Sequence, residues 1–529
     1  MKPFDANGSF APTVPDGGHA LRRLAVKGAG MTILSGGGGL AIQVVATVVL
    51  SRLLTPRDFG LVAMVMTFSL LLMNCGLNGI TEAIIQREDI THALASNFFW
   101  INLGVGSMLT LIFAAAAPLL ARFYGDALVA PITVGMAATI FLTSTSVLHL
   151  ALLKRAMLFS KVAANDLIAR AVSVLVSIAL GWAGWGYWAL VVGACATPLS
   201  TAIGAMAMCR WIPGPPRRAA GTGTMLKFAS HTYARFGVNY FARNTDYLIV
   251  GWRFGAHQLG FYKKAYDLFA LSAAQLVVST SSVAVSALSR VKDDRVQYTR
   301  YLLGAISVMA VIGMGLAGGL TLTGPDVIRI LLGPRWGEAG RIFTFFAPGI
   351  GMMLVSGTQG WIHLSLGRAD RWLRWSTFEW IATVLLFIAG LHWGAEGIAA
   401  AWCASFWLLT VPAMWYAGKP IGLGVGTMFG VIWRYIVASL FAGPMTALIF
   451  SGAHRLWQAS GAGGAVLRTA CFLTVFTALY LGAVIVLYQG LSPLRRLTGL
   501  MREMRSPSSS RRGELAIPLN NTSEGLQTP

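Results

Sequence analysis

The centre of the chain holds an apolar stretch that also carries charge, and this combination decides how the sequence folds. Residues 240–251 read YFARNTDYLIVG, within a longer stretch from Met225 to Asp267. At about 100° per residue, a helix through this stretch places five polar residues on one face. They are His231, Arg235, Asn239, Arg243 and Asp246. A charge at bilayer depth costs roughly 2.5–3.5 kcal/mol, so such residues normally face a bundle interior or a water-filled cavity. The pattern predicts a cationic stripe that faces a cavity.

Two simpler interpretations stay open at this point. In the first, Arg243 and Asp246, which lie one turn apart, form a self-neutralised structural pair. This interpretation leaves Arg235 unexplained. Asp166 and Arg170, also one turn apart, form an intrahelical ion pair in the second. Alternatively, Arg170 extends the basic surface onto the first half of the protein.

Composition indicates a polytopic membrane protein. The 529 residues are 55% hydrophobic and only 12% charged, with a mean hydropathy of +0.64. These values exclude an ordinary soluble domain. The net charge of +21 would suggest a nucleic-acid partner in a soluble protein, but here Lys and Arg concentrated in cytoplasmic loops explain it better. The five cysteines have no spacing that predicts a disulfide frame or a metal site.

The apolar stretches predict an all-α fold with about fourteen transmembrane helices, since each needs about 20 mostly apolar residues. The predicted spans are 28–50, 58–82, 96–120, 128–152, 164–184, 186–208, 225–251, 262–288, 301–323, 341–364, 373–392, 395–417, 428–451 and 466–488. Residues 1–27 are polar and basic without a cleavable apolar core, which predicts a cytoplasmic tail. The basic tail 491–529, rich in Ser and Pro, is predicted to be disordered.

A weak internal repeat predicts two lobes. Residues 53–61 read LLTPRDFGL, and residues 253–261, 200 positions later, read RFGAHQLGF. Six helices per repeat is an even number, so the copies share an orientation and are related by a pseudo-twofold axis along the membrane normal. We expect a first lobe at 28–210, a cytoplasmic linker at 211–224 and a second lobe at 225–420. Two additional transmembrane helices at 421–490 follow as an appendage.

Several motifs resemble the Wzx-type flippases of lipopolysaccharide and exopolysaccharide synthesis. The motifs are SRLLTPRDFG at 51–60, QRED at 86–89, NFFWIN at 97–102, NYFARNTD at 239–246 and LGFYKKAY at 259–266. The similarity spans roughly residues 20–420. It lies closest to the branch that contains colanic-acid and succinoglycan exporters, within the multidrug/oligosaccharidyl-lipid/polysaccharide exporter superfamily.

The resemblance implies a function at the bacterial inner membrane. It implies transport of an undecaprenyl-diphosphate-linked oligosaccharide from the cytoplasmic to the outer face, with no enzymatic step, cofactor or metal. The family's cationic cavity maps onto Arg235 and Arg243, and Arg170 is a third candidate. We add Asn239 and Asp246 as candidate substrate-binding residues because they share the helical face. A polysaccharide polymerase and a chain-length regulator are candidate partners.

A cation-coupled exporter of small amphipathic molecules, from the same superfamily, is the alternative function. Such an exporter should favour acidic residues over arginine in its cavity. The sequence has no P-loop motif for ATP hydrolysis. It also shows no paired carboxylates of the kind that an acid–base enzyme uses.

We predict that both termini lie in the cytoplasm. In this orientation the inner loops and tails hold more than twice as many of the 41 Lys and Arg residues as the outer loops, as the positive-inside rule requires. The check is a pair of C-terminal fusions. A β-galactosidase fusion should be active and an alkaline phosphatase fusion inactive, and the opposite pattern would overturn this topology.

Overall fold

The chain is helical almost throughout the part that its structure describes. The computed structural model describes residues 3–5, 7–10, 18–87, 90–216, 222–452 and 461–490, with some helical side chains left out. Within these ranges the only β-structure is two isolated bridges, Phe4 with Phe10 and Ser9 with Thr91. The predicted all-α class is confirmed.

The helices follow one another with short connections. The first group is α1 (Gly18–Leu53), α2 (Pro56–Gln86), α3 (His92–Ala115), α4 (Ala117–Tyr124), α5 (Val129–Arg155), α6 (Phe159–Trp182) and α7 (Tyr187–Cys209). The long α8 (Thr222–Arg290) comes next. The second group is α9 (Arg295–Leu332), η1 (Pro334–Trp336), α10 (Gly337–Phe346), α11 (Gly349–Ser356), α12 (Gln359–Ser365), α13 (Ala369–Gly390), η2 (Leu391–Trp393), α14 (Gly394–Gly418) and η3 (Lys419–Ile421). The last two described helices are α15 (Val425–Ser451) and α17 (Gly461–Tyr488).

Ten helical stretches in the described part of the chain are long and apolar enough to cross a membrane. An eleventh is counted if the bent pair Pro334–Phe346 and Gly349–Ser365 forms one broken span. The predicted number of fourteen is not confirmed. Ala369–Ile421 is one of the ten stretches but contains two helices, α13 and α14, where two spans were predicted. The long α8, also predicted as two spans, consists of two helices joined at a kink at Gly255 and is not among the ten.

One predicted span and one predicted loop have a different backbone from the one expected. The segment 341–364 was predicted as one helix, but it bends by 55° between Phe346 and Gly349. Pro348 lies at this bend, and proline cannot continue the hydrogen-bond ladder of a helix. The predicted loop between residues 251 and 262 is instead helical on both sides of a single break at Gly255, whose φ of 78° is one that glycine readily adopts.

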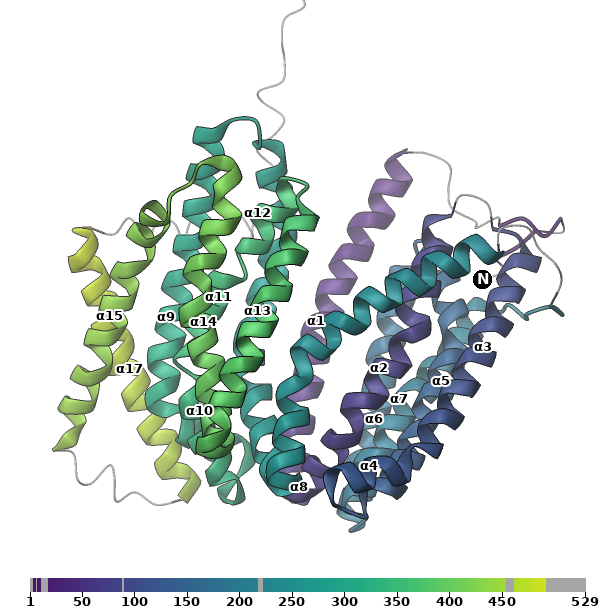
Figure 1. Ribbon diagram of the computed structural model, residues 1–529, viewed down its shortest axis with the longest axis horizontal. Coiled ribbons are helices and arrows are strands. Elements are labelled where there is room, and N and C mark those ends of the chain that lie inside the picture. The colour runs from purple at the N-terminus through teal and green to yellow at the C-terminus, as the bar shows by residue number, and fades with distance from the viewer. Residues whose placement is uncertain are drawn as a thin grey trace, which may run out of the picture.

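The two helix groups lie side by side and meet at one end. Figure 1 shows α1–α7 on one side and α9–α14 on the other, with α8 running between them. The groups converge where α1 ends and α2 begins, and diverge toward the end at which α8 begins. One apolar cluster continues across the junction, from Met64 and Ile132 to Trp336, Phe343 and Ile398. The division into two lobes with a pseudo-twofold axis stays a prediction.

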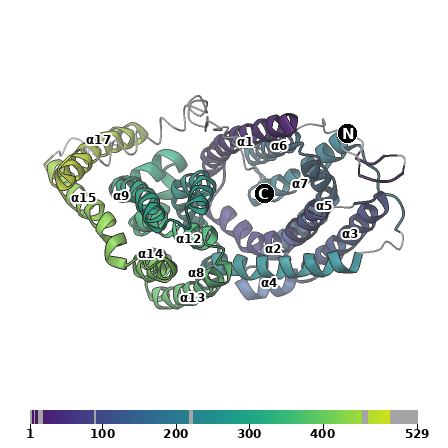
Figure 2. The same cartoon turned by 90° about the horizontal axis from the view of Figure 1, so that it is seen from above.

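The helices α15 and α17 pack on the outer side of α9 (Figure 2). The side chain of Ser439 donates to the carbonyl of Met314 at 2.9 Å, and the Tyr480 hydroxyl donates to the carbonyl of Val311 at 2.8 Å. Arg468 forms a two-pronged ion pair with Asp326, at 2.9 and 2.6 Å. Planar guanidinium–carboxylate pairs of this kind are specific in geometry, so the two helices have a defined position on the second group.

A capping box starts α2. The Thr55 hydroxyl accepts from the backbone N–H of Asp58 at 3.3 Å, and the Asp58 carboxylate accepts from the backbone N–H of Thr55 at 2.9 Å. Pro56 fills the first helical position, where no backbone donor is needed. Arg57 pairs with Asp126 at 3.0 Å, with an Arg57 side chain that is 56% exposed. The composition Thr-Pro-Arg-Asp at 55–58 predicts a helix-entry cap, and hence structural roles for Arg57 and Asp58. In the structure Asp58 belongs to the cap, whereas Arg57 makes only an exposed ion pair.

We expect Asp58→Ala to lower the amount of protein in the membrane more than Arg57→Ala does. Losing a helix cap costs about 1 kcal/mol, whereas an exposed ion pair contributes about 0–1 kcal/mol. Quantitative immunoblotting of membranes, together with export per molecule, measures both effects. Normal abundance with abolished export in Asp58→Ala would contradict the structural role.

Candidate functional site

The backbone of α8 carries the predicted cationic stripe. Residues 235, 239, 243 and 246 all lie in its first half, before the break at Gly255, so their helical spacing is as predicted. The side chains of Arg235, Asn239 and Arg243 lie outside the described residues. Their part in a binding site stays a prediction.

Two tyrosines hold the first half of α8 against α2. The Tyr233 hydroxyl donates to the carbonyl of Leu71 at 2.9 Å, and the Tyr240 hydroxyl donates to the carbonyl of Thr67 at 2.7 Å. Their seven-residue spacing puts both on one face of α8. Positions 235 and 246 lie about 120–160° away from these tyrosines around the helix, whereas position 243 lies about 60–80° away. Positions 235 and 246 therefore do not belong to the face that contacts α2, and position 243 lies at its border.

Asp246 on the stripe face is fully buried. One carboxylate oxygen, Oδ2, accepts from the Tyr262 hydroxyl at 2.9 Å and from the Trp402 indole N–H at 3.0 Å. Tyr262 lies in the second half of α8 and Trp402 lies in α14. The carboxylate thus joins both halves of α8 to the second helix group. The other oxygen, Oδ1, makes no hydrogen bond with the described residues.

Aromatic rings surround this carboxylate. The ring of Tyr262 lies 6.1 Å from Tyr247 and 5.3 Å from Phe346, and Tyr266 lies 5.9 Å from Trp402. Burial of a carboxylate is costly unless it accepts hydrogen bonds, and the two donors offset part of that cost. Asp246 is therefore fixed by its neighbours, and its described contacts suit a residue that positions α8.

Arg170 makes the intrahelical ion pair that was left open as an alternative. Its Nε lies 2.9 Å from Asp166 Oδ2, one turn away in α6, and both side chains are 49% exposed. The neighbouring helix α1 approaches through Gly39, where an added Cβ would lie 3.7 Å from the Arg170 side chain. The half-exposed guanidinium remains accessible to a ligand, so the pair and a binding role are compatible.

The residue pattern gave no reason to select Tyr262, Trp402 or Trp336. Tyr262 and Trp402 are the donors to Asp246, from 16 and 156 positions away. Trp336 donates from its indole to the carbonyl of Ser51 at 2.8 Å, so it links the second group to the end of α1. A single polar atom on a large apolar ring is a weak sequence signal, because its partner depends on tertiary packing.

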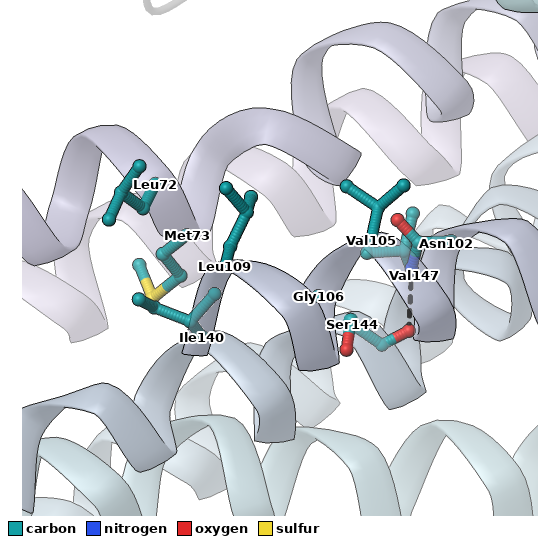
Figure 3. A pocket seen from close by; sticks show the side chains of 9 residues that line it. All are labelled: Leu72, Met73, Asn102, Val105, Gly106, Leu109, Ile140, Ser144 and Val147. Atoms are coloured by element: carbon teal, nitrogen blue, oxygen red, sulfur yellow. Dashed lines mark hydrogen bonds between the residues drawn. The ribbon is translucent and has the colours of Figure 1, made fainter. Parts of the chain in front are cut away.

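A small cavity inside the first group is a packing feature and not a substrate site. Asn102 spans one side of it and donates to the carbonyl of Ser144 at 2.7 Å (Figure 3). Its volume of about 10 Å³ is close to the minimum for one water molecule. The lining residues are Leu72, Met73, Asn102, Val105, Gly106, Leu109, Ile140, Ser144 and Val147.

Comparison with known protein families identifies the family of this chain. Residues 49–341, more than half of the chain, match the family of polysaccharide biosynthesis proteins. The chain belongs to this family. It is 23% identical to the succinoglycan biosynthesis transport protein ExoT of Rhizobium meliloti (strain 1021), over 68% of this chain and 73% of that protein. It is 21% identical to the lipopolysaccharide biosynthesis protein WzxC of Escherichia coli (strain K12), over 76% and 82%. The predicted Wzx-type resemblance is confirmed.

A solved structure of the lipid II flippase MurJ, in an inward closed conformation, shares the fold. The TM-score is 0.69 at 12% sequence identity, with 88% of this chain and 99% of that chain covered. At this identity the similarity shows the fold alone. Together with the candidate spans, it makes this polysaccharide biosynthesis protein a multi-pass membrane protein.

We expect Tyr262→Phe and Trp402→Phe to destabilise the protein. Each change removes one donor from the buried Asp246 carboxylate, which costs about 1–3 kcal/mol for an unsatisfied buried group. Thermal unfolding in detergent should show a lower midpoint for both. Tyr247→Phe is the matched control, because Tyr247 lies beside Tyr262 in the same aromatic cluster. Its hydroxyl makes no hydrogen bond with the described residues. Equal midpoints for Tyr262→Phe and Tyr247→Phe would contradict this role of Asp246.

Proposed function

We propose that this protein is a flippase for lipid-linked oligosaccharides. It moves an undecaprenyl-diphosphate-linked repeat unit from the cytoplasmic to the outer face of the bacterial inner membrane, for exopolysaccharide or lipopolysaccharide synthesis. The family match over residues 49–341 carries this proposal. The names of the relatives ExoT and WzxC, and of the structural neighbour MurJ, support it.

The charges of α8 suit the headgroup of such a substrate. A diphosphate diester carries about two negative charges, and arginine recognises phosphate oxygens through two parallel hydrogen bonds. Arg235 and Arg243 lie two turns apart on one face of α8. We propose that they bind the diphosphate, that Asn239 between them adds a polar contact, and that Arg170 offers a third cation from the first helix group.

We propose that Asp246 acts on this site through α8. Asp246 lies three residues after Arg243, and its hydrogen bonds with Tyr262 and Trp402 fix the helix at this point. The polyprenyl tail remains in lipid throughout. No bond of the substrate is made or broken, so the protein needs no catalytic group, cofactor or metal. A polysaccharide polymerase and a chain-length regulator are the proposed partners on the receiving side.

Deletion of the gene tests the flippase proposal against the exporter alternative. A flippase predicts loss of surface polysaccharide and accumulation of the lipid-linked repeat unit on the cytoplasmic side. A cation-coupled exporter of small amphipathic molecules predicts normal lipid-linked intermediates and greater sensitivity to such molecules. Extraction and mass spectrometry of the lipid-linked intermediates, from intact cells and from inverted vesicles, distinguish the two.

Arg243→Ala should lower the surface polysaccharide of a complemented deletion strain by about tenfold or more. The free energy of one charge-assisted hydrogen bond corresponds to a change in affinity of about this size. Arg243→Lys should retain part of the export, because lysine keeps the charge but lacks the planar fork. Both variants should reach the membrane in normal amounts.

A double variant provides the control for charge neutralisation. If Arg243 only neutralised Asp246, then Arg243→Ala with Asp246→Ala would restore export, since no unpaired charge would remain buried. We expect no restoration. A fully active double variant would rule out the ligand role of Arg243 and leave Arg235 as the principal candidate.

A further inference from the structure

The two copies of the internal repeat contact each other directly. Residues 53–61 end α1 and begin α2, and residues 253–261 surround the break in α8. A Cβ added to Gly60 would overlap the carbonyl oxygen of Ala256, and a Cβ added to Gly260 would overlap the carbonyl oxygen of Pro56. We call these four residues the glycine seam. Only glycine permits backbones to approach this closely.

The glycine seam is reciprocal. Pro56 and Ala256 differ by 200 positions, and so do Gly60 and Gly260. Gly60 meets the carbonyl of Ala256, and Gly260 meets the carbonyl of Pro56. Equivalent residues of the two copies therefore make equivalent contacts. A contact in which the same patch is used by both partners is the signature of a twofold axis. The seam accordingly lies where a pseudo-twofold axis between the two groups would pass.

Three hydrogen bonds cross between the helix groups beside the seam. The Ser51 hydroxyl donates to the carbonyl of Leu332 at 3.3 Å, and the Arg52 guanidinium donates to the carbonyl of Ile330 at 3.2 Å. The indole of Trp336 donates to the carbonyl of Ser51 at 2.8 Å. All three acceptors lie in the last turn of α1 or of α9, where carbonyls have no partner within their own helix. These bonds can exchange for water without breaking a helix.

Side chains also meet across the seam. The Phe59 ring lies 5.5 Å from Trp336, and Trp336 lies 5.8 Å from Phe261. The ammonium of Lys264 lies 4.1 Å from the centre of the Phe59 ring, although the residue is only 8% exposed. Separation of the groups here would return this cation to water, which offsets part of the lost aromatic contact.

We propose that the glycine seam is a releasable gate between the two helix groups. It is closed in this structure and opens about the pseudo-twofold axis during transport. In the predicted orientation it lies at the outer face, so its opening would release the headgroup there. This inference rests on the proposed function, because a gate is needed only if cargo crosses. The reciprocity gives it a specific consequence: the two glycines should be equivalent in their effect on opening.

Thiol labelling tests this equivalence. Ser51→Cys, at a residue that is 1% exposed beside the seam, serves as the reporter in a background in which Cys75, Cys195, Cys209, Cys403 and Cys471 are replaced. Gly60→Ala and Gly260→Ala should each raise the rate of labelling by a membrane-impermeant maleimide about tenfold or more. The two increases should be similar, because each added methyl group pushes apart the same two backbones.

Matched controls use glycines with free space. An added Cβ at Gly104 in α3 or at Gly304 in α9 would have no neighbour within 4 Å. Gly104→Ala and Gly304→Ala should therefore leave the labelling rate unchanged. Unchanged labelling in both seam variants, at normal abundance, would overturn the proposal. A change in only one of them would overturn the reciprocal gate.

A cross-link keeps the test decisive if the seam variants fail to fold. Phe59→Cys with Lys264→Cys, joined by a flexible bifunctional thiol reagent, should abolish export, and a reductant should restore it when the spacer contains a disulfide. Export that persists at full cross-linking would show that the seam stays closed, and would refute the gate. The labelling measurement requires no knowledge of the cargo, so its result is independent of the gene-deletion result that tests the flippase proposal.

Discussion

The contact of backbone with backbone between α2 and α8 fixes how the two helix groups lie relative to each other. Gly60 and Gly260 bring the main chains together, and the apolar cluster that runs from Met64 to Phe343 passes through the same junction. In lipid there is no hydrophobic force between helices, so close approach and well-packed contacts must supply the attraction. The aromatic pairs of Trp336 with Phe59 and Phe261 and its hydrogen bond to Ser51 lie beside this close approach. A Cβ at either glycine would overlap a backbone carbonyl, so a side chain there would push the two backbones apart.

The second constraint is the charge within α8. A carboxylate inside an apolar bundle needs donors, and Asp246 obtains them from Tyr262 across the break in α8 and from Trp402 in α14. The tyrosines at 233 and 240 contact α2 on another face of the helix. The helix is thus attached to one group by hydroxyls and to the other by a carboxylate. Both attachments use a few directional bonds, and they leave the position of Arg235 on a face that does not contact α2.

Local features of the fold could be predicted from the sequence, and distant ones could not. The helical register of 235–246 and the cap formed by Thr55 and Asp58 depend on neighbours in the chain, and both are as predicted. The donors to Asp246 come from a tyrosine and a tryptophan whose rings look like ordinary apolar residues. The fourteen predicted spans were counted from hydropathy alone, which does not register the bend at Pro348. Long-range packing, which no local pattern encodes, accounts for the donors to Asp246. The bend depends on a local proline that a hydropathy count leaves out.

The proposed headgroup site and the proposed gate are parts of one helix. Arg243 and Asp246 precede the break at Gly255, and Gly260 and Lys264 follow it. A ligand changes a conformational equilibrium only by its difference in affinity for the two states. A diphosphate bound at the proposed site would change the electrostatic energy of the first half of α8. The Asp246–Tyr262 hydrogen bond joins that half to the second, two residues from Gly260. The rings of Tyr247, Tyr262 and Tyr266 also meet across the break, so the proposed site and the proposed gate would be linked through these contacts.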